Sequence, residues 1–138
     1  MLPIRPFLMS NEDKFNKPQI VRLILNKDVE QALVLLSKYY HVTVPKVKVG
    51  LPKGRKKHVY GCYTSKNQTI SVLNSDVLGN PFVILHEFYH HLRSRSVDRQ
   101  HRGTEKNANK FAAEFLIAYQ TEIRKGLSNA LLGAFRNG

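Results

Sequence analysis

The order of structural patterns along this 138-residue chain predicts an α+β fold. Helical patterns come first, a strand and a two-stranded hairpin follow, and further helices complete the chain. Because helices and strands are grouped rather than alternating, a parallel sheet built from βαβ units is not expected. The length and the 42% hydrophobic content predict a single folded domain over residues 1–138.

The N-terminal third predicts an arm and two helices. Residues 1–16 mix proline, asparagine and charges and are expected to form the arm. Pro18 suits the first turn of a short helix, where a backbone N–H has no helical partner. Asp28 and Gln31 have the spacing of a capping box, which would open the second helix. The expected apolar faces consist of Ile20, Val21, Leu23 and Ile24 in the first helix and Val29, Ala32, Leu33, Leu36 and Tyr40 in the second.

The middle of the chain predicts a small mixed or antiparallel sheet. Valines alternate with other residues over 41–51, which predicts a strand. Pro45 lies within that segment and favours an edge position or a kink, because proline cannot donate a hydrogen bond to a neighbouring strand. Two further segments, 59–63 and 69–73, flank a polar turn and predict a hairpin.

The third helical pattern carries the most informative motif of the chain, His86-Glu87-Phe88-Tyr89-His90. Asn80 and Pro81 provide a helix start. On a helix, both imidazoles lie on one face, and Glu87 lies about 100° round from His86. The apolar residues Ile84, Leu85, Phe88 and Leu92 would then face the core, with Val83 shielding the metal face. This H-E-x-x-H pattern is typical of a zinc-dependent hydrolase in which the glutamate is the general base.

Other residues near the motif have less specific roles. His91 points about 140° from His86 and is expected to be a structural, half-buried or surface histidine. Residues 93–103 form a polar, arginine-rich segment, which predicts a loop. Thr104 can then cap a final long helix over 105–125, with Gly126 as its stop and a short helix over 129–135 behind it.

A catalytic zinc ion needs a third protein ligand, for which Asp98, His101, Glu105 and Glu114 are candidates. Ser96 stands where a metzincin would have its third histidine, which excludes that class. Glu105 and Glu114 point about 180° apart on the predicted helix, so only one can face the motif. The side of Glu105 carries small alanines that permit close helix packing, whereas Glu114 lies near Lys110 in a pattern typical of a solvated face. Geometry therefore favours Glu105, and Asn109, one turn further, could orient a ligating histidine.

Residues 86–92 (HEFYHHL) and 105–116 (EKNANKFAAEFL) resemble the ImmA/IrrE family of metallopeptidases, whose pattern is H-E-x-x-H followed by E-x-x-A-N-x-F-A-x-E-x-L. The resemblance implies a minimal gluzincin, a zincin-like domain with His86, His90 and Glu105 on one zinc ion and Glu87 as the base. It also implies a hairpin beside the cleft and a specific intracellular protein as substrate, such as a DNA-bound repressor. Two departures are the short arginine-rich segment after His90 and the lack of a separate helix-turn-helix or sensor domain.

Two alternatives stay open on the residues alone. The stretch from His101 to Glu105 is also similar to SprT-like proteases of DNA-bound proteins, in which a downstream histidine, here His101, would be the third ligand. A non-enzymatic, basic nucleic-acid-binding module on the same scaffold is the other alternative, although such a protein has no use for Glu87. Candidates for stabilising an oxyanion are Tyr60, Tyr63, Tyr89, His101 and the arginines of 93–102.

The net charge of +12 predicts attraction to nucleic acid or an acidic partner. A single cysteine, Cys62, excludes an internal disulfide framework, and the N-terminus lacks a signal-peptide core, so a cytoplasmic protein with no membrane contact is expected. The basic residues most suited to a partner lie in two clusters, Lys53, Arg55, Lys56 and Lys57 in the first and Arg93, Arg95, Arg99 and Arg102 in the second.

Overall fold

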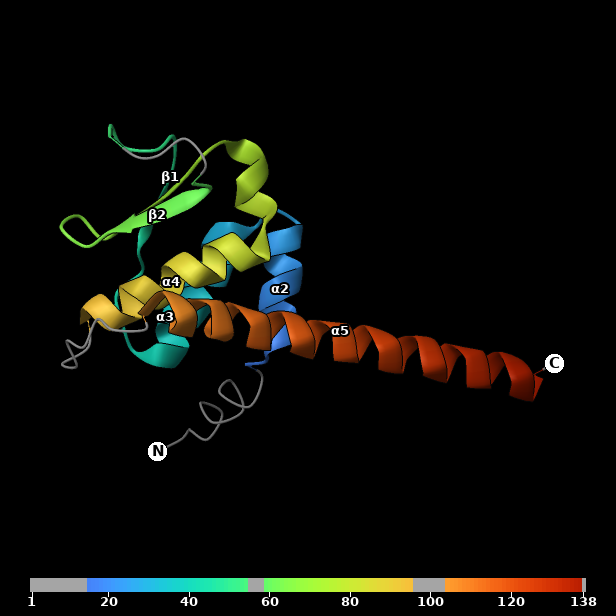
Figure 1. The fold of residues 1–138 in the computed structure, drawn as a ribbon. Coiled ribbons are helices and arrows are strands. Elements are labelled where there is room, and N and C mark those ends of the chain that lie inside the picture. The colour runs from blue at the N-terminus through green and yellow to red at the C-terminus, as the bar shows by residue number, and fades with distance from the viewer. Residues whose placement is uncertain (1–14, 55–58, 96–103, 138) are drawn as a thin grey trace, which may run out of the picture.

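The computed structural model describes residues 15–54, 59–95 and 104–137. Within these ranges the fold is α+β, as predicted, with the helices packed on one side of a small mixed sheet (Figure 1). Most of the predicted arm, much of the first basic cluster and most of the predicted arginine-rich loop lie outside the described residues. The elements in order are α2 (Lys17–Leu25), α3 (Val29–Tyr40), β1 (Lys46–Val49), β2 (Gly61–Thr64), β3 (Thr69–Val72), the 3-10 turn η1 (Ser75–Gly79), α4 (Pro81–Arg95) and α5 (Thr104–Asn137).

The two N-terminal helices begin where the sequence predicts, but by different means. The side chain of Asn16 accepts a hydrogen bond from the backbone N–H of Gln19 at 2.8 Å and caps α2, with Pro18 in the first turn. Asp28 occupies the cap position of α3, yet its side chain makes no capping bond, so the predicted capping box is wrong. The backbone explains this, because the Asp28 N–H is bonded to the Leu23 carbonyl at 2.8 Å and its ψ of 55° is not the extended conformation of a capping residue.

The sheet has the strand order β1-β3-β2, in which β1 runs parallel and β2 antiparallel to the central β3. The hairpin of β2 and β3 and the edge position of β1 were both predicted correctly. The predicted strand over 41–51 is too long, because only residues 46–49 pair with β3. Pro45 has no N–H to donate, and Gly50 turns the chain away at φ +110°.

The central helix of the fold is α4, which contacts the sheet, α2, α3 and α5. Asn80 caps it by accepting a hydrogen bond from the backbone N–H of Val83 at 3.2 Å, and Pro81 is its first residue. The predicted core residues Ile84, Leu85 and Phe88 are fully buried. The helix continues to Arg95, two residues beyond the predicted start of the polar loop.

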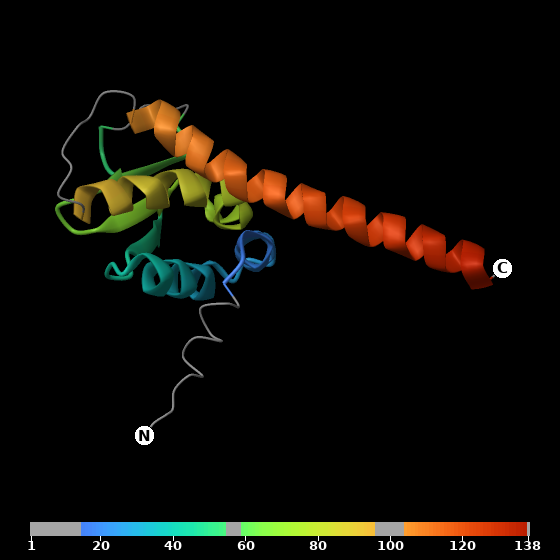
Figure 2. The ribbon, with the colours of Figure 1, turned by 90° about the horizontal axis from the view of Figure 1, so that it is seen from below.

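The last helix, α5, differs most from the prediction, since it is one continuous helix of 34 residues. The predicted stop at Gly126 and the separate helix over 129–135 are therefore wrong. Gly126 does not adopt a positive φ, so the chain stays helical through it. The N-terminal part of α5 packs on α4 and α2, and the rest projects well beyond the domain (Figures 1 and 2). No helix in the described part of the chain is long and apolar enough to cross a membrane.

Candidate metal centre

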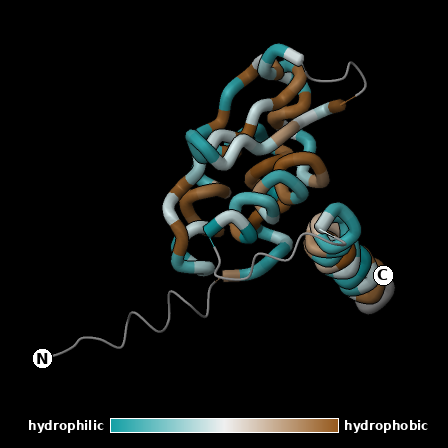
Figure 3. The backbone as a smooth tube through the Cα atoms, turned by 60° about the vertical axis from the view of Figure 1, so that its left-hand side comes forward, coloured by the Kyte–Doolittle hydropathy of each residue, from teal (hydrophilic) through white to brown (hydrophobic). Residues whose placement is uncertain are grey.

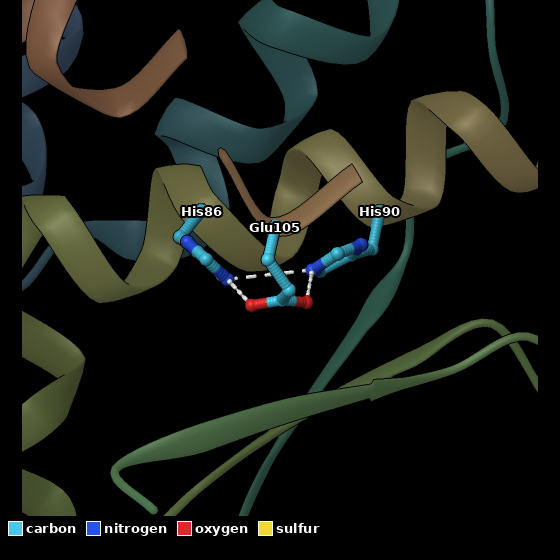
Figure 4. Close-up of side chains that lie close together, drawn as sticks. All are labelled: His86, His90 and Glu105. Atoms are coloured by element: carbon cyan, nitrogen blue, oxygen red, sulfur yellow. Dashed lines mark hydrogen bonds and ion pairs between the residues drawn. The ribbon is translucent and has the colours of Figure 1, made fainter. Parts of the chain in front are cut away.

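Two histidines of α4 and one glutamate of α5 converge on one point, as Figure 4 shows. The Nε2 atoms of His86 and His90 lie 3.3 Å apart. One carboxylate oxygen of Glu105 lies 3.0 Å from Nε2 of His86, and the other lies 2.9 Å from Nε2 of His90. The structure thus brings together the three residues that the sequence selected, and this group could hold a metal ion.

Close packing of α5 on α4 is what places Glu105 between the histidines. Ala108 and Ala112, one and two turns beyond Glu105, are fully buried. Their small side chains let two helices approach closely, as the sequence suggested. Glu114 is exposed, on the far side of α5 from Glu105.

Asn109 determines which nitrogen of His86 is available. The amide oxygen of Asn109 lies 2.8 Å from Nδ1 of His86. Because that oxygen can only accept, Nδ1 carries the proton and donates the hydrogen bond. In the neutral ring, Nε2 then carries a lone pair that points to the centre of the cluster. This is the arrangement in which a partner on the far ring nitrogen orients a metal ligand.

The spacing of the three ligands fits a tetrahedral metal ion. A tetrahedron with metal–nitrogen bonds of about 2.05 Å has edges of about 3.3 Å, which is the separation of the two Nε2 atoms. The contacts of Glu105 are shorter by only a few tenths of an ångström. A metal ion at the centre would be bound by a lone pair from each Nε2 and by the carboxylate of Glu105, a combination of two neutral donors and one anion that suits a divalent cation.

Burial lowers the pKa of His90, and the charge of His86 lowers it further, while Glu105 acts in the opposite direction. Since burial dominates, the neutral ring is favoured. Metal ions bind the neutral imidazole, so this environment favours coordination over protonation. His86 and His90 have side chains only 13% and 19% exposed, whereas the Glu105 side chain is 75% exposed and leaves the centre open on one side.

Glu87, the predicted base, is buried on the side of α4 that faces the sheet. A side chain at Gly61 of β2 would be 2.8 Å from Cγ1 of Val83 and 3.5 Å from Cγ of Glu87. The absence of a side chain at Gly61 therefore lets α4 lie directly against β2 and gives Glu87 its place. Val83 was predicted to shield the metal face, and it is buried against this strand.

His91 is fully buried and makes a network that the sequence did not reveal. Its Nε2 donates to the Thr43 carbonyl at 2.7 Å, so Nδ1 accepts from the Tyr63 hydroxyl, also at 2.7 Å. The structural role predicted for His91 is confirmed, although it is buried more deeply than expected. Its partners lie 48 and 28 residues away in the chain, a separation that no local pattern can signal.

The other candidate residues are placed less specifically. The hydroxyl proton of Tyr63 is engaged with His91, which makes it a poor oxyanion donor. Tyr60 is 62% exposed, and Tyr89 packs beside His90 and Phe111. Lys53 and Arg95 are exposed. The alternative ligands Asp98 and His101, together with Arg55, Lys56, Lys57, Arg99 and Arg102, lie outside the described residues.

Comparisons of the chain with models of protein families, with curated proteins and with solved structures found no match. The class of site therefore depends on its own geometry, a potential three-ligand metal centre on an α+β scaffold.

Proposed function

We propose that this protein is a zinc-dependent metallopeptidase of the gluzincin type. The observation that carries the proposal is the convergence of His86, His90 and Glu105, with Glu87 in the same helical turn as His86. Two histidines and one carboxylate are a donor set that suits zinc, and three protein ligands leave one position for water or substrate. A structural zinc site, by contrast, usually has four protein ligands.

In the proposed hydrolysis, a bound zinc ion and the side chains of the protein have separate roles. A bound zinc ion supplies a water of lowered pKa and polarises the carbonyl of the peptide bond. Glu87 takes the proton of the attacking water and delivers it to the leaving amine. Asn109 holds the His86 ring in the orientation that this geometry needs. Val83, which is buried in the first turn of α4, limits access of solvent to the metal centre from the side of the sheet.

The test is the substitution Glu87→Gln, which keeps the shape of the side chain and removes the base. The variant is expected to bind one zinc ion per chain, measured by elemental analysis, and to cleave peptides at least about 100-fold more slowly than the parent. Glu114→Gln is the matched control, because Glu114 is exposed on the other side of α5. Full activity of Glu87→Gln, or a parent protein that binds no zinc, would overturn the proposal.

A second candidate, nucleic-acid binding, is favoured by the net charge of +12. It is compatible with peptidase activity if the substrate is a protein bound to DNA. The measurement is the affinity for a DNA duplex at several salt concentrations. A logarithmic affinity that falls steeply with the logarithm of salt concentration supports this partner, and no binding at low salt excludes it.

A further inference from the structure

The projecting part of α5 exposes large apolar side chains without a partner in the described part of the domain. Glu122 pairs with Arg22 of α2, and from there to residue 132 every side chain is exposed. Leu127 and Leu131 are 61% and 62% exposed. An isolated helical segment of this length that contains Gly126 and Gly133 is only marginally stable in water. Figure 3, in which α5 is seen almost end-on beside the domain, shows brown apolar segments along this helix.

These apolar side chains form one stripe, which we call the α5 stripe and define as Ile123, Leu127, Ala130, Leu131 and Ala134. The spacing from Ile123 to Leu127, Ala130 and Ala134 is four, three and four residues, which is the repeat of a coiled-coil seam. On the helical wheel the stripe spans about 100°. Glu122 and Lys125 lie outside the stripe, and Arg124 lies beside Leu131 on one flank.

The sizes of these residues indicate what covers the stripe. Two large members, Ile123 and Leu127, come first along the helix, and the small members Ala130 and Ala134 come later, on either side of the third large member, Leu131. When two such helices run antiparallel, Ile123 of one copy lies level with Ala134 of the other, and Leu127 lies level with Ala130. Ile123 and Leu127 then each face a small side chain, in the arrangement that close helix packing needs, while Leu131 lies at the edge of the stripe beside Arg124. Gly126 and Gly133 form the other flank and add no bulk between the backbones.

Charge placement supports the same occupant. The chain carries +12, so two copies repel one another at long range. Along the α5 stripe, however, Arg124 is the only charged flanking residue between Ile123 and Ala134, and antiparallel pairing brings it near Leu131 of the other copy rather than near another cation. The residues of the α5 stripe are uncharged and offer no cation to an acidic partner. The large and small side chains of one copy instead fit the small and large side chains of a second copy.

We propose that the α5 stripe is the interface of an antiparallel homodimer of this chain. The interface covers about three helical turns and is smaller than a standard protein interface, so a dissociation constant on the order of 10–100 μM is expected. Glu105 lies 18 residues before Ile123, about 27 Å along the helix, so pairing leaves the metal centre free.

The first test is sedimentation equilibrium of the full chain at concentrations below and above that range. The parent is expected to approach twice the chain mass of 15.8 kDa. Leu127→Lys is expected to stay monomeric, because it puts a cation in the seam. Leu132→Lys is the matched control, since Leu132 is 54% exposed but lies about 140° round the helix from Leu127.

The second test concerns the direction of pairing. Ile123→Cys and Ala134→Cys variants are oxidised separately and as a mixture, with the parent as blank because its Cys62 is buried. The mixture is expected to form a disulfide-linked pair, and neither variant alone should do so, since positions 123 and 134 lie about 16 Å apart along one helix.

Several outcomes would overturn the inference. They are a parent that is monomeric at every concentration, equal losses in Leu127→Lys and Leu132→Lys, or a crosslink formed by Ile123→Cys alone. Loss of anionic-vesicle binding in Leu127→Lys would show that a membrane surface covers the stripe. A parent monomer in which Leu127→Lys increases protease cleavage within residues 1–14 would show that the N-terminal segment covers it. Zinc content is independent of all these results, so failure of the dimer leaves the metallopeptidase proposal intact.

Discussion

At the scale of single residues, the metal centre depends on a side chain that does not contact the converging point. Asn109 fixes the proton of His86 on Nδ1 and thereby leaves the lone pair of Nε2 able to bind a metal ion. The sequence suggested this role because Asn109 lies one turn beyond Glu105 on the same face. The particular histidine it contacts could not be predicted, since that depends on the crossing of α4 and α5.

Asn109→Ala is expected to lower zinc affinity by about 10- to 100-fold, because the ring of His86 loses the partner that fixes its proton and orientation. Competition with a coloured chelator measures the affinity. Asn107→Ala is the control, as Asn107 is exposed two residues earlier on the same helix. Equal affinities of the parent and Asn109→Ala would contradict a role in orienting the ligand.

Two adjacent histidines of α4, the partly buried His90 and the fully buried His91, predict a dependence of stability on pH. Burial lowers the pKa of His91 and of His90 from the usual 6.5. The unfolded chain therefore binds more protons than the folded chain below about pH 6.5. Their contribution to stability is complete above that pH and is lost as the pH falls through the folded-state pKa values.

The urea midpoint of the metal-free protein is accordingly expected to decrease between pH 7 and pH 5. His91→Met removes one titrating group and leaves the Tyr63 hydroxyl and the Thr43 carbonyl without their partner. This variant should be less stable at pH 7 yet lose less stability on acidification. An unchanged loss on acidification would exclude His91 as a source.

At the scale of elements, local patterns predicted the identity of each helix and strand better than its length. Asn80-Pro81 starts a helix as expected, because capping depends on residues close in sequence, whereas Asn16, which was assigned to the N-terminal arm, caps the helix predicted at Pro18. The predicted end of α5 at Gly126 was wrong, because a glycine permits a helix to stop but does not force it to do so. The predicted capping box at Asp28 did not form because the Asp28 N–H bonds the Leu23 carbonyl and closes the Schellman turn that ends α2, in which Lys27 adopts a φ of 62°.

The close approach of α4 to β2 predicts an unusually strong effect of a methyl group at Gly61. Gly61→Ala would bring its Cβ to 2.8 Å from Cγ1 of Val83 and 3.3 Å from the Ser71 carbonyl oxygen. Overpacking of this kind costs about 1–3 kcal/mol of unfolding free energy, measured by urea denaturation. The cost should shrink in a Val83→Ala background, which removes the clashing methyl group. Equal costs in both backgrounds would show that Val83 is not the obstacle.

At the scale of the whole molecule, the candidate site lies where α4 and α5 meet. Glu105 of α5 is 15 residues from His90 and 19 residues from His86 in the sequence. The i,i+4 histidines could be recognised from the sequence, since one helix places them both. The choice of Glu105 over Glu114 followed from helical phase, and the structure places Glu105 at the histidines. The projection of α5 could not be anticipated, because exposure depends on where the remainder of the domain ends.

Because the centre joins α4 to α5, zinc is expected to stabilise the whole domain. An ion at 100 times its dissociation constant adds about 2.7 kcal/mol if it binds only the folded state, which raises Tm on the order of 10 °C for a domain of this size. A chelator should reverse the shift in a thermal unfolding experiment. Glu105→Ala removes one ligand and should abolish most of the shift, whereas Glu114→Ala should keep it, since Glu114 is exposed away from the centre. Equal zinc-induced shifts in the two variants would mean that Glu105 does not complete the site and that a different residue takes its place.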